Sequence, residues 1–143
     1  MAGPPDRASF FRWGGAKGSA HFTLCSHPAA GNCVIDGDTI QYDGMRIRIA
    51  DIDAPETYHY RCERELALGT SATRRLLDLL NAGPFELRRQ GFRDVDVYGR
   101  KLRVIERDHQ SLGELLVNAG LARRWDGARH PWCDAQDGDS YSQ

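Results

Sequence analysis

Hydrophobic and polar residues alternate in the first half of the chain in a way that predicts strands. Residues 39–51 read TIQY, an Asp43-Gly44 turn, then MRIRIAD. Asp-Gly between two alternating stretches is typical of a β-hairpin. Apolar stretches at 21–25 and 33–35 predict strands before the hairpin, and residues 84–93 and 97–107 predict a second, less regular pair after it.

Two other segments follow the helical period. Residues 63–82 place five side chains on one stripe, and Gly83-Pro84 ends that helix. The capping box Ser111-Leu-Gly-Glu114 opens a second, short helix. Strands, helix, strands and short helix follow one another without regular βαβ alternation. We therefore expect an α+β protein, mainly β, built on a small mixed barrel.

Length and composition place this fold in one domain. The chain has 143 residues, of which 41% are hydrophobic and 27% charged, enough to form a packed core. We expect the domain to cover residues 21–133, after a flexible Gly/Pro/Ala-rich arm (1–20) and before a flexible acidic tail (134–143). No apolar segment is long enough for a membrane helix, and the first 25 residues show no ordinary signal peptide.

The net charge argues against a strongly basic protein, but the charges are unevenly distributed along the chain. The formal net charge of −1 argues against a strongly basic nucleic-acid-binding domain. Residues 85–107 nevertheless carry a local excess of arginine, the side chain best suited to bind phosphate in two places at once. A solvated strand face is the plainer interpretation of that excess.

Carboxylates are concentrated in two short segments that flank the hairpin. The five residues are Asp36, Asp38, Asp51, Asp53 and Glu56. So many acids repel one another unless a cation lies between them, and Ca²⁺ takes carboxylate and carbonyl oxygens in flexible geometry. The alternative is that each Asp serves a turn. Arg48 and Arg100 near such a cation would form a site for a phosphoryl group, whereas either arginine alone is more often a surface residue.

The motifs in these segments are recognisable when taken together. Asp36-Gly-Asp38-Thr39, Arg48, Asp53-Ala-Pro55-Glu56-Thr57, Tyr98-Gly99-Arg100 and Gly120-Leu121-Ala122 resemble the staphylococcal nuclease (thermonuclease) family, over about residues 33–125. The resemblance implies a five-stranded OB-fold-type barrel with two packed helices and Ca²⁺-dependent hydrolysis of DNA and RNA. It also implies a nucleic-acid substrate, and we expect a monomer.

The resemblance also assigns roles to residues. Asp38, Asp53 and the main-chain carbonyl of Ala54 match the residues that hold the Ca²⁺ ion. Glu56 matches the residue that orients or deprotonates the attacking water. Arg48 and Arg100 match the pair that binds the phosphate and stabilises its transition state, and Tyr98, inside the motif, is expected to contact substrate.

Three features depart from the family pattern. The family usually has Thr at the position of Ala54, where only the carbonyl is needed. The chain also ends in a Gly/Asp/Ser tail with poor helix propensity, so we expect no long C-terminal helix and weaker non-specific DNA affinity. Strict alternation further places Arg48 and Asp53 on opposite faces, so a bulge, bend or strand end must bring them together.

A non-catalytic OB-type module that binds nucleic acid or a protein partner is the alternative function. The set Glu56, Arg48 and Arg100 favours the enzyme, because a pure binder needs no water-activating carboxylate beside a phosphate-binding arginine pair.

Four cysteines allow three pairings. We expect Cys25–Cys33, which flank a short loop that a hairpin would close, and then Cys62–Cys133. A zinc site is the competing interpretation, because His59-x-x-Cys62 and His130-x-x-Cys133 share one spacing, and free thiols are a third. Disulfides would indicate an exported protein, periplasmic or secreted, although the missing signal peptide favours the cytoplasm.

Overall fold

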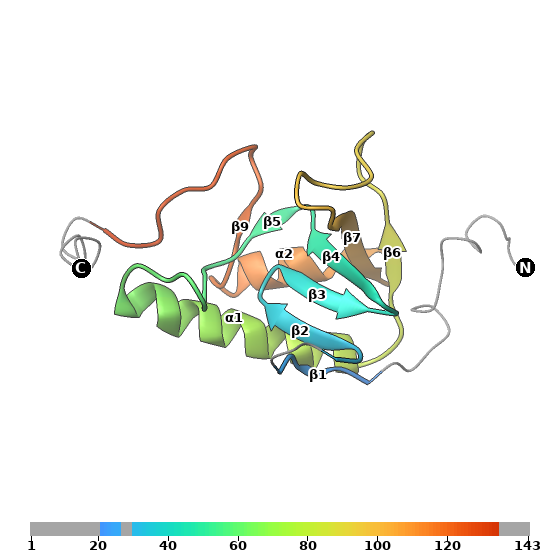
Figure 1. Cartoon of the computed structure of the whole chain (residues 1–143), viewed down its shortest axis with the longest axis horizontal. Coiled ribbons are helices and arrows are strands. Elements are labelled where there is room, and N and C mark those ends of the chain that lie inside the picture. The colour runs from blue at the N-terminus through green and yellow to red at the C-terminus, as the bar shows by residue number, and fades with distance from the viewer. Residues whose placement is uncertain (1–20, 27–29, 135–143) are drawn as a thin grey trace, which may run out of the picture.

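A mixed β-sheet forms the framework of residues 21–26 and 30–134, the part of the chain that the computed structural model describes (Figure 1). The strands of this sheet lie in the order β1-β2-β3-β4-β7-β6, and β8 pairs with β7. A second, two-stranded sheet pairs β5 with β9. The strands are β1 (Thr23–Leu24), β2 (Cys33–Asp36), β3 (Thr39–Tyr42), β4 (Met45–Ile49), β5 (Ile52–Asp53), β6 (Glu86–Arg88), β7 (Lys101–Arg107), β8 (Gln110–Ser111) and β9 (Arg123–Arg124).

The predicted hairpin is confirmed as β3 and β4, which pair antiparallel with Tyr42 opposite Met45. Both turn residues have positive φ, 54° at Asp43 and 79° at Gly44. A two-residue turn with both central φ values positive matches the right-handed twist of the strands it joins, which is why Asp-Gly is favoured there.

The second predicted strand pair is also present but shorter than expected. β6 and β7 pair antiparallel, whereas residues 89–100 between them make a long connection with one isolated bridge, Val95 to Lys101. Gly91 and Gly99 in this connection have positive φ, which breaks a regular strand.

The α+β class is confirmed, but a closed five-stranded barrel is not shown. Within residues 21–26 and 30–134, the strand pairings run as an open path from β1 to β6. β1 also pairs parallel to β2, which differs from the antiparallel hairpin expected around Cys25 and Cys33. The predicted arm, residues 1–20, and residues 135–143 of the predicted tail lie outside the described residues.

The two predicted helices are confirmed, and they complete the core. α1 (Glu63–Asn81) lies along the sheet near β2 (Figure 1), and α2 (Leu112–Asn118) packs against β7. The Oγ of Ser111 accepts a hydrogen bond from the Glu114 amide, as the capping box requires. The core between helices and sheet contains Val34, Ile40, Ile47, Ile49, Ile52, Leu76, Leu80, Leu87, Ile105, Leu112 and Leu116.

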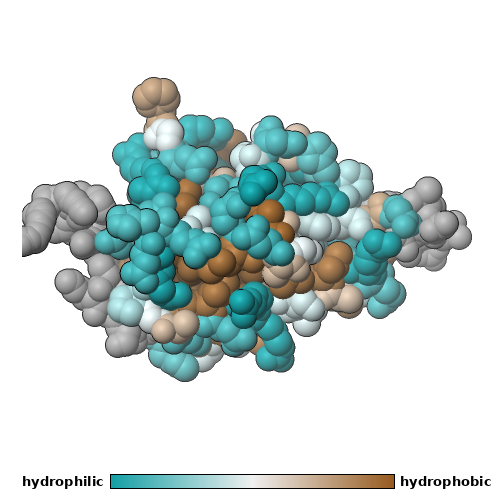
Figure 2. Space-filling view, turned by 180° about the vertical axis from the view of Figure 1, so that it is seen from behind, coloured by the Kyte–Doolittle hydropathy of each residue, from teal (hydrophilic) through white to brown (hydrophobic). Residues whose placement is uncertain are grey.

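The outer surface is mainly hydrophilic around a limited apolar area. On the face opposite to that of Figure 1, apolar residues gather near the middle and hydrophilic residues surround them (Figure 2). No helix in residues 21–26 and 30–134 is long and apolar enough to cross a membrane. After α2 the described chain forms only β9 and irregular structure up to Asp134, and the rest of the tail, for which no long helix was expected, lies outside the described residues.

Gly69 of α1 is the point where this helix touches the loop that follows β5. A Cβ at Gly69 would lie 2.8 Å from the carbonyl oxygens of both Pro55 and Glu56. We expect Gly69→Ala to lower the free energy of unfolding by about 1–3 kcal/mol, because steric crowding outweighs the gain in helix propensity of about 1 kcal/mol. Denaturant titration measures the change. Ser71→Ala, on the exposed side of the same helix, is the control and should not destabilise.

Candidate metal and phosphate site

Asp38 and Asp53, which lie 15 residues apart in the sequence, meet beside the amide of Ala54. Asp38 is buried, and its Oδ2 accepts a hydrogen bond of 2.9 Å from the Ala54 backbone N. Gly37 permits this approach, because a Cβ at Gly37 would lie 2.8 Å from the Cβ of Ala54. The predicted metal-ligating residues are therefore brought together at one place by the D-G-D turn and the end of β5.

Burial makes the carboxylates of Asp36 and Asp53 costly to ionise. It raises the pKa of Asp36 well above its usual value, and the charge of Asp38 raises it further. Burial also raises the pKa of Asp53, although the charges of Arg129 and Arg48 oppose that rise. A cation placed between Asp36 and Asp53 would therefore favour their charged forms.

Asp51 does not belong to this cluster. Its Oδ2 accepts a hydrogen bond of 2.6 Å from the Ser111 hydroxyl, at the start of α2. The backbone carbonyl of Asp51 accepts from the Trp125 amide at 2.9 Å. Of the five carboxylates near the hairpin in sequence, this one therefore ties the hairpin to α2 and to the C-terminal segment.

A strand end separates Arg48 from Asp53, because β4 ends at Ile49, the chain turns at residues 50–51, and β5 begins at Ile52. This turn interrupts the strict alternation that would place the two residues on opposite faces. Arg48 lies opposite Thr39 in the β3–β4 pair, next to Asp38, and its buried guanidinium comes within 3.7 Å of that carboxylate. Arg48 also donates to the carbonyls of Ile49 and Ile52, and its guanidinium lies 5.5 Å from the Trp125 ring centroid.

Arg100 reaches the same region from a tight turn. The carboxylate of Asp96 accepts hydrogen bonds from the backbone amides of Tyr98 and Arg100, and its Oδ2 lies 2.7 Å from the Arg100 Nε. Although partial burial opposes ionisation, these bonds hold the pKa of Asp96 below its usual value. Gly99 adopts the φ of 83° that the turn needs. Tyr98 is 80% exposed, and its ring centroid lies 5.4 Å from the Arg100 guanidinium.

Glu56 is positioned by a residue that the sequence patterns did not reveal. The buried Glu65 carboxylate, in the first turn of α1, accepts hydrogen bonds from the backbone amides of Glu56 (3.2 Å) and Arg61 (2.9 Å). These two bonds fix both ends of the loop between β5 and α1. The Glu56 side chain itself is 29% exposed and faces the site.

Arg129 is the second residue that the sequence patterns did not reveal. Its Nη1 lies 2.6 Å from Asp53 Oδ1 and 3.4 Å from Glu56 Oε2. Burial opposes its charge, but the carboxylates of Asp38, Asp53, Glu56 and Asp36 outweigh burial and raise its pKa. A single arginine in an irregular segment carries no recognisable pattern. The nearest residue with a predicted role is Cys133, whose expected bond to Cys62 would place this segment near the start of the first helix.

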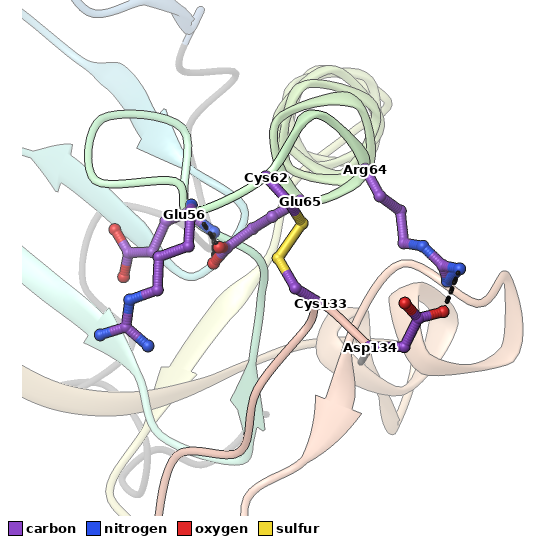
Figure 3. The surroundings of a disulfide bond; sticks show 7 residues. Glu56, Cys62, Arg64, Glu65, Cys133 and Asp134 are labelled. Carbon is purple, nitrogen blue, oxygen red and sulfur yellow. Dashed lines mark hydrogen bonds and ion pairs between the residues drawn. A yellow bond between two sulfur atoms is a disulfide. The ribbon is translucent and has the colours of Figure 1, made fainter. Parts of the chain in front are cut away.

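Both predicted disulfides are present, Cys25–Cys33 and Cys62–Cys133. Among the described residues no cysteine is free, and the second disulfide uses Cys62 and Cys133, so the zinc interpretation, which needs both thiolates as ligands, is wrong. The reason expected for the first bond is also wrong, because Cys25 and Cys33 join parallel rather than hairpin strands. The second bond fastens the C-terminal segment beside the start of α1, where Arg64 and Asp134 also form an ion pair of 3.3 Å (Figure 3).

Three adjoining cavities surround these residues. The largest, about 670 Å³, is lined by carboxylates and arginines that include Asp36, Asp38, Glu56 and Arg100. A second, of about 280 Å³, lies between Tyr98, Trp125, Arg48 and Arg100. A third, of about 290 Å³, lies beside Asp53 and Glu56 and is closed by residues 129–132. Arg129 lines all three cavities.

Comparison with known proteins identifies the class. The family model "Staphylococcal nuclease homologue" matches residues 46–139, most of the chain, and the chain belongs to this family. Two relatives from Bacillus subtilis (strain 168), the endonuclease YncB and the SPbeta prophage-derived endonuclease YokF, are each 36% identical over 94 residues. That match covers 62% of this chain, 44% of YncB and 31% of YokF, so the chain spans less than half the length of either relative.

The family implies a Ca²⁺ site, and the residues present fit one. The buried carboxylates of Asp38 and Asp53 converge with the Ala54 backbone, and a positive group, Arg129, already lies against Asp53. Two carboxylates and one carbonyl make an open oxygen set, which Ca²⁺ tolerates and which leaves coordination for water and substrate. Asp38 lies outside the range matched by the family model, so its place in the site rests on the structure and its own motif.

Proposed function

We propose that the protein is a Ca²⁺-dependent nuclease that hydrolyses phosphodiester bonds of DNA and RNA with little sugar or sequence specificity. One observation carries the proposal. Two buried carboxylates, the exposed edge of Glu56 and the guanidinium groups of Arg48 and Arg100 surround connected cavities. Metal ligands, a proton acceptor and phosphate-binding groups are the components that phosphodiester hydrolysis requires. The endonuclease names of the two relatives support the same activity.

Each group has a definite task in this proposal. Asp38, Asp53 and the Ala54 carbonyl hold the cation, which when bound polarises the phosphoryl group and neutralises its charge. Glu56 orients the attacking water and accepts its proton as the new P–O bond forms and the ester P–O bond breaks. Arg100 binds the phosphoryl oxygens as their negative charge increases, and Arg48 assists from the adjoining cavity.

The cavity between Tyr98 and Trp125 is suited to a base next to the reacting phosphate. Both rings are exposed at its edge, at 80% and 40%. Aromatic rings bind bases of any sequence by stacking, because every base has a π-face. This explains how a chain of near-neutral net charge could bind single strands without reading their sequence.

Cleavage of single-stranded DNA under different metal conditions tests the proposal. We expect millimolar Ca²⁺ to support cleavage and Mg²⁺ to be at least about tenfold less effective, because an open oxygen set does not impose the octahedral geometry that Mg²⁺ demands. Chelator should abolish cleavage, and added Ca²⁺ should restore it. Full activity in chelator, or with Mg²⁺ alone, would contradict the proposed metal site.

The alternative, a non-catalytic module, predicts DNA binding without cleavage under every metal condition. No residue of the proposed catalytic set is replaced by an inert one, which favours the enzyme. We also propose that the protein is exported, since it contains two disulfides and disulfides form and persist in oxidising compartments.

A further inference from the structure

The Arg129 guanidinium lies against the two carboxylates that the proposed function assigns to metal binding and water activation. Its Nη1 is 2.6 Å from Asp53 Oδ1, within the range of a strong charge-assisted hydrogen bond, and 3.4 Å from Glu56 Oε2. Asp53 is 4% exposed at its side chain, whereas Arg129 is 45% exposed. The buried Asp53 carboxylate is thus neutralised by the Arg129 guanidinium, which is exposed enough to move away toward solvent.

The segment that carries Arg129, residues 125–134, is held over the site at both ends. At its start, β9 pairs with β5 and so lies directly beside Asp53. At its end, Cys133 is bonded to Cys62 at the start of α1. Between them, Arg123 donates to the His130 carbonyl at 3.1 Å, and its guanidinium lies 3.7 Å from the Trp132 ring centroid. In Figure 1 this segment runs from β9 to the loop that precedes α1.

Arg129 and a divalent cation would compete for the same carboxylates. A cation bound to Asp53 would be repelled by a guanidinium that is hydrogen-bonded to the same side chain. Arg129 also lines all three cavities, so its side chain is their common boundary in this conformation. Repulsion between the two cations therefore favours movement of Arg129 away from Asp53 when a metal binds.

We propose that Arg129 is the resident counter-ion of the metal site, that a divalent cation must displace it, and that the Cys62–Cys133 disulfide holds it in place. This inference rests on the proposed function for the identity of the metal ligands. Arg129 then sets the affinity of the site for Ca²⁺: it stabilises the metal-free protein and competes with the incoming ion.

Calorimetric titration of Ca²⁺ in the absence of nucleic acid tests this competition directly. We expect Arg129→Ala to lower the dissociation constant for Ca²⁺ by about tenfold, as for loss of a half-buried ion pair that the metal would have to break. Arg129→Lys, which keeps the charge, should remain closer to the wild type. Arg124→Ala is the matched control: Arg124 lies in the neighbouring strand β9, and its guanidinium binds Glu114 instead.

The metal-free protein provides a second readout. Arg129→Ala should lower its denaturant midpoint, because Asp53 loses its partner, and saturating Ca²⁺ should remove that difference. A third measurement tests the role of the Cys62–Cys133 disulfide. Replacing both cysteines by serine should lower the dissociation constant for Ca²⁺, as Arg129→Ala does. The pair Cys25 and Cys33, at the β1 edge of the sheet, is the control disulfide.

The outcomes separate this inference from the proposed function. Unchanged or weaker Ca²⁺ binding by Arg129→Ala overturns the inference while a cleaving wild type leaves the nuclease intact. Tighter binding by Arg129→Ala in a protein that never cleaves DNA supports the inference and overturns the nuclease. If neither the wild type nor the variant binds Ca²⁺, both are wrong.

Discussion

Replacing Arg100 by lysine is expected to lower the rate of DNA cleavage by about a thousandfold, the effect typical of an arginine that stabilises a phosphoryl transition state. Lysine keeps the charge but lacks the planar fork that binds two phosphate oxygens. It also cannot reproduce the bond from the Arg100 Nε to Asp96, which now orients the guanidinium. Single-turnover cleavage at saturating Ca²⁺ measures the change.

Arg48→Lys should cause a loss of similar size for a partly different reason. Arg48 is buried and donates to the carbonyls of Ile49 and Ile52, so lysine would also leave buried carbonyls without partners. A denaturant titration therefore accompanies the rate measurement, and only the rate of the folded variant is compared.

Arg88→Lys is the control for both arginine variants. Arg88 is an exposed arginine of β6 that pairs with Glu106, away from the three cavities. A loss of less than about tenfold in either site variant, equivalent to about 1.4 kcal/mol, would place that arginine outside the reaction.

Glu56→Gln is expected to lower the cleavage rate by about 10² to 10⁴, the range for loss of a general base. Glutamine has nearly the same size and still hydrogen-bonds water, but it cannot accept the proton. The backbone of residue 56 stays fixed by the Glu65 carboxylate, so the loop should keep its position. Rates measured against pH, at saturating Ca²⁺, give the size of the loss.

Glu63→Gln provides the matched control, since Glu63 lies exposed in the first turn of α1. Calcium binding by Glu56→Gln should remain within a few fold of the wild type, which separates proton transfer from metal holding. A variant that cleaves within tenfold of the wild-type rate would show that Glu56 only positions water or is not involved.

Local features of the fold were predictable wherever local energetics decide the structure. The Asp43-Gly44 hairpin could be predicted because its turn needs two positive φ values, which Asp, Asn and Gly adopt more readily than other residues. The capping box at Ser111 satisfies a helix amide without help from the rest of the chain. Residues 89–100 do not continue the predicted strand pair. The positive φ values of Gly91 and Gly99 and the turn held by the Asp96 carboxylate interrupt regular strand pairing there.

The candidate site could be predicted only in part. Residues such as Asp38, Asp53 and Arg100 belong to short motifs that distinguish them from the other charged residues of the chain. Glu65 and Arg129 belong to no such motif. Glu65 acts through backbone amides of the preceding loop, and Arg129 acts through a carboxylate 76 residues away in the sequence. Asp51 is the converse case, because it is close to the acidic residues in the sequence but hydrogen-bonds to Ser111, outside the site.

By itself, the sequence determined the α+β class, the hairpin, the two helices and the nuclease-like motifs, because propensity, turn chemistry and motif spacing are local properties. The cysteine pairs were also predicted correctly, although the second joins residues that are 71 positions apart. Only the tertiary structure decided the open sheet order, the parallel β1–β2 pair and the approach of the Arg48 guanidinium to Asp38. It also decided that Arg129 lies on Asp53. These contacts join residues far apart in the chain, and packing of the whole core selects them.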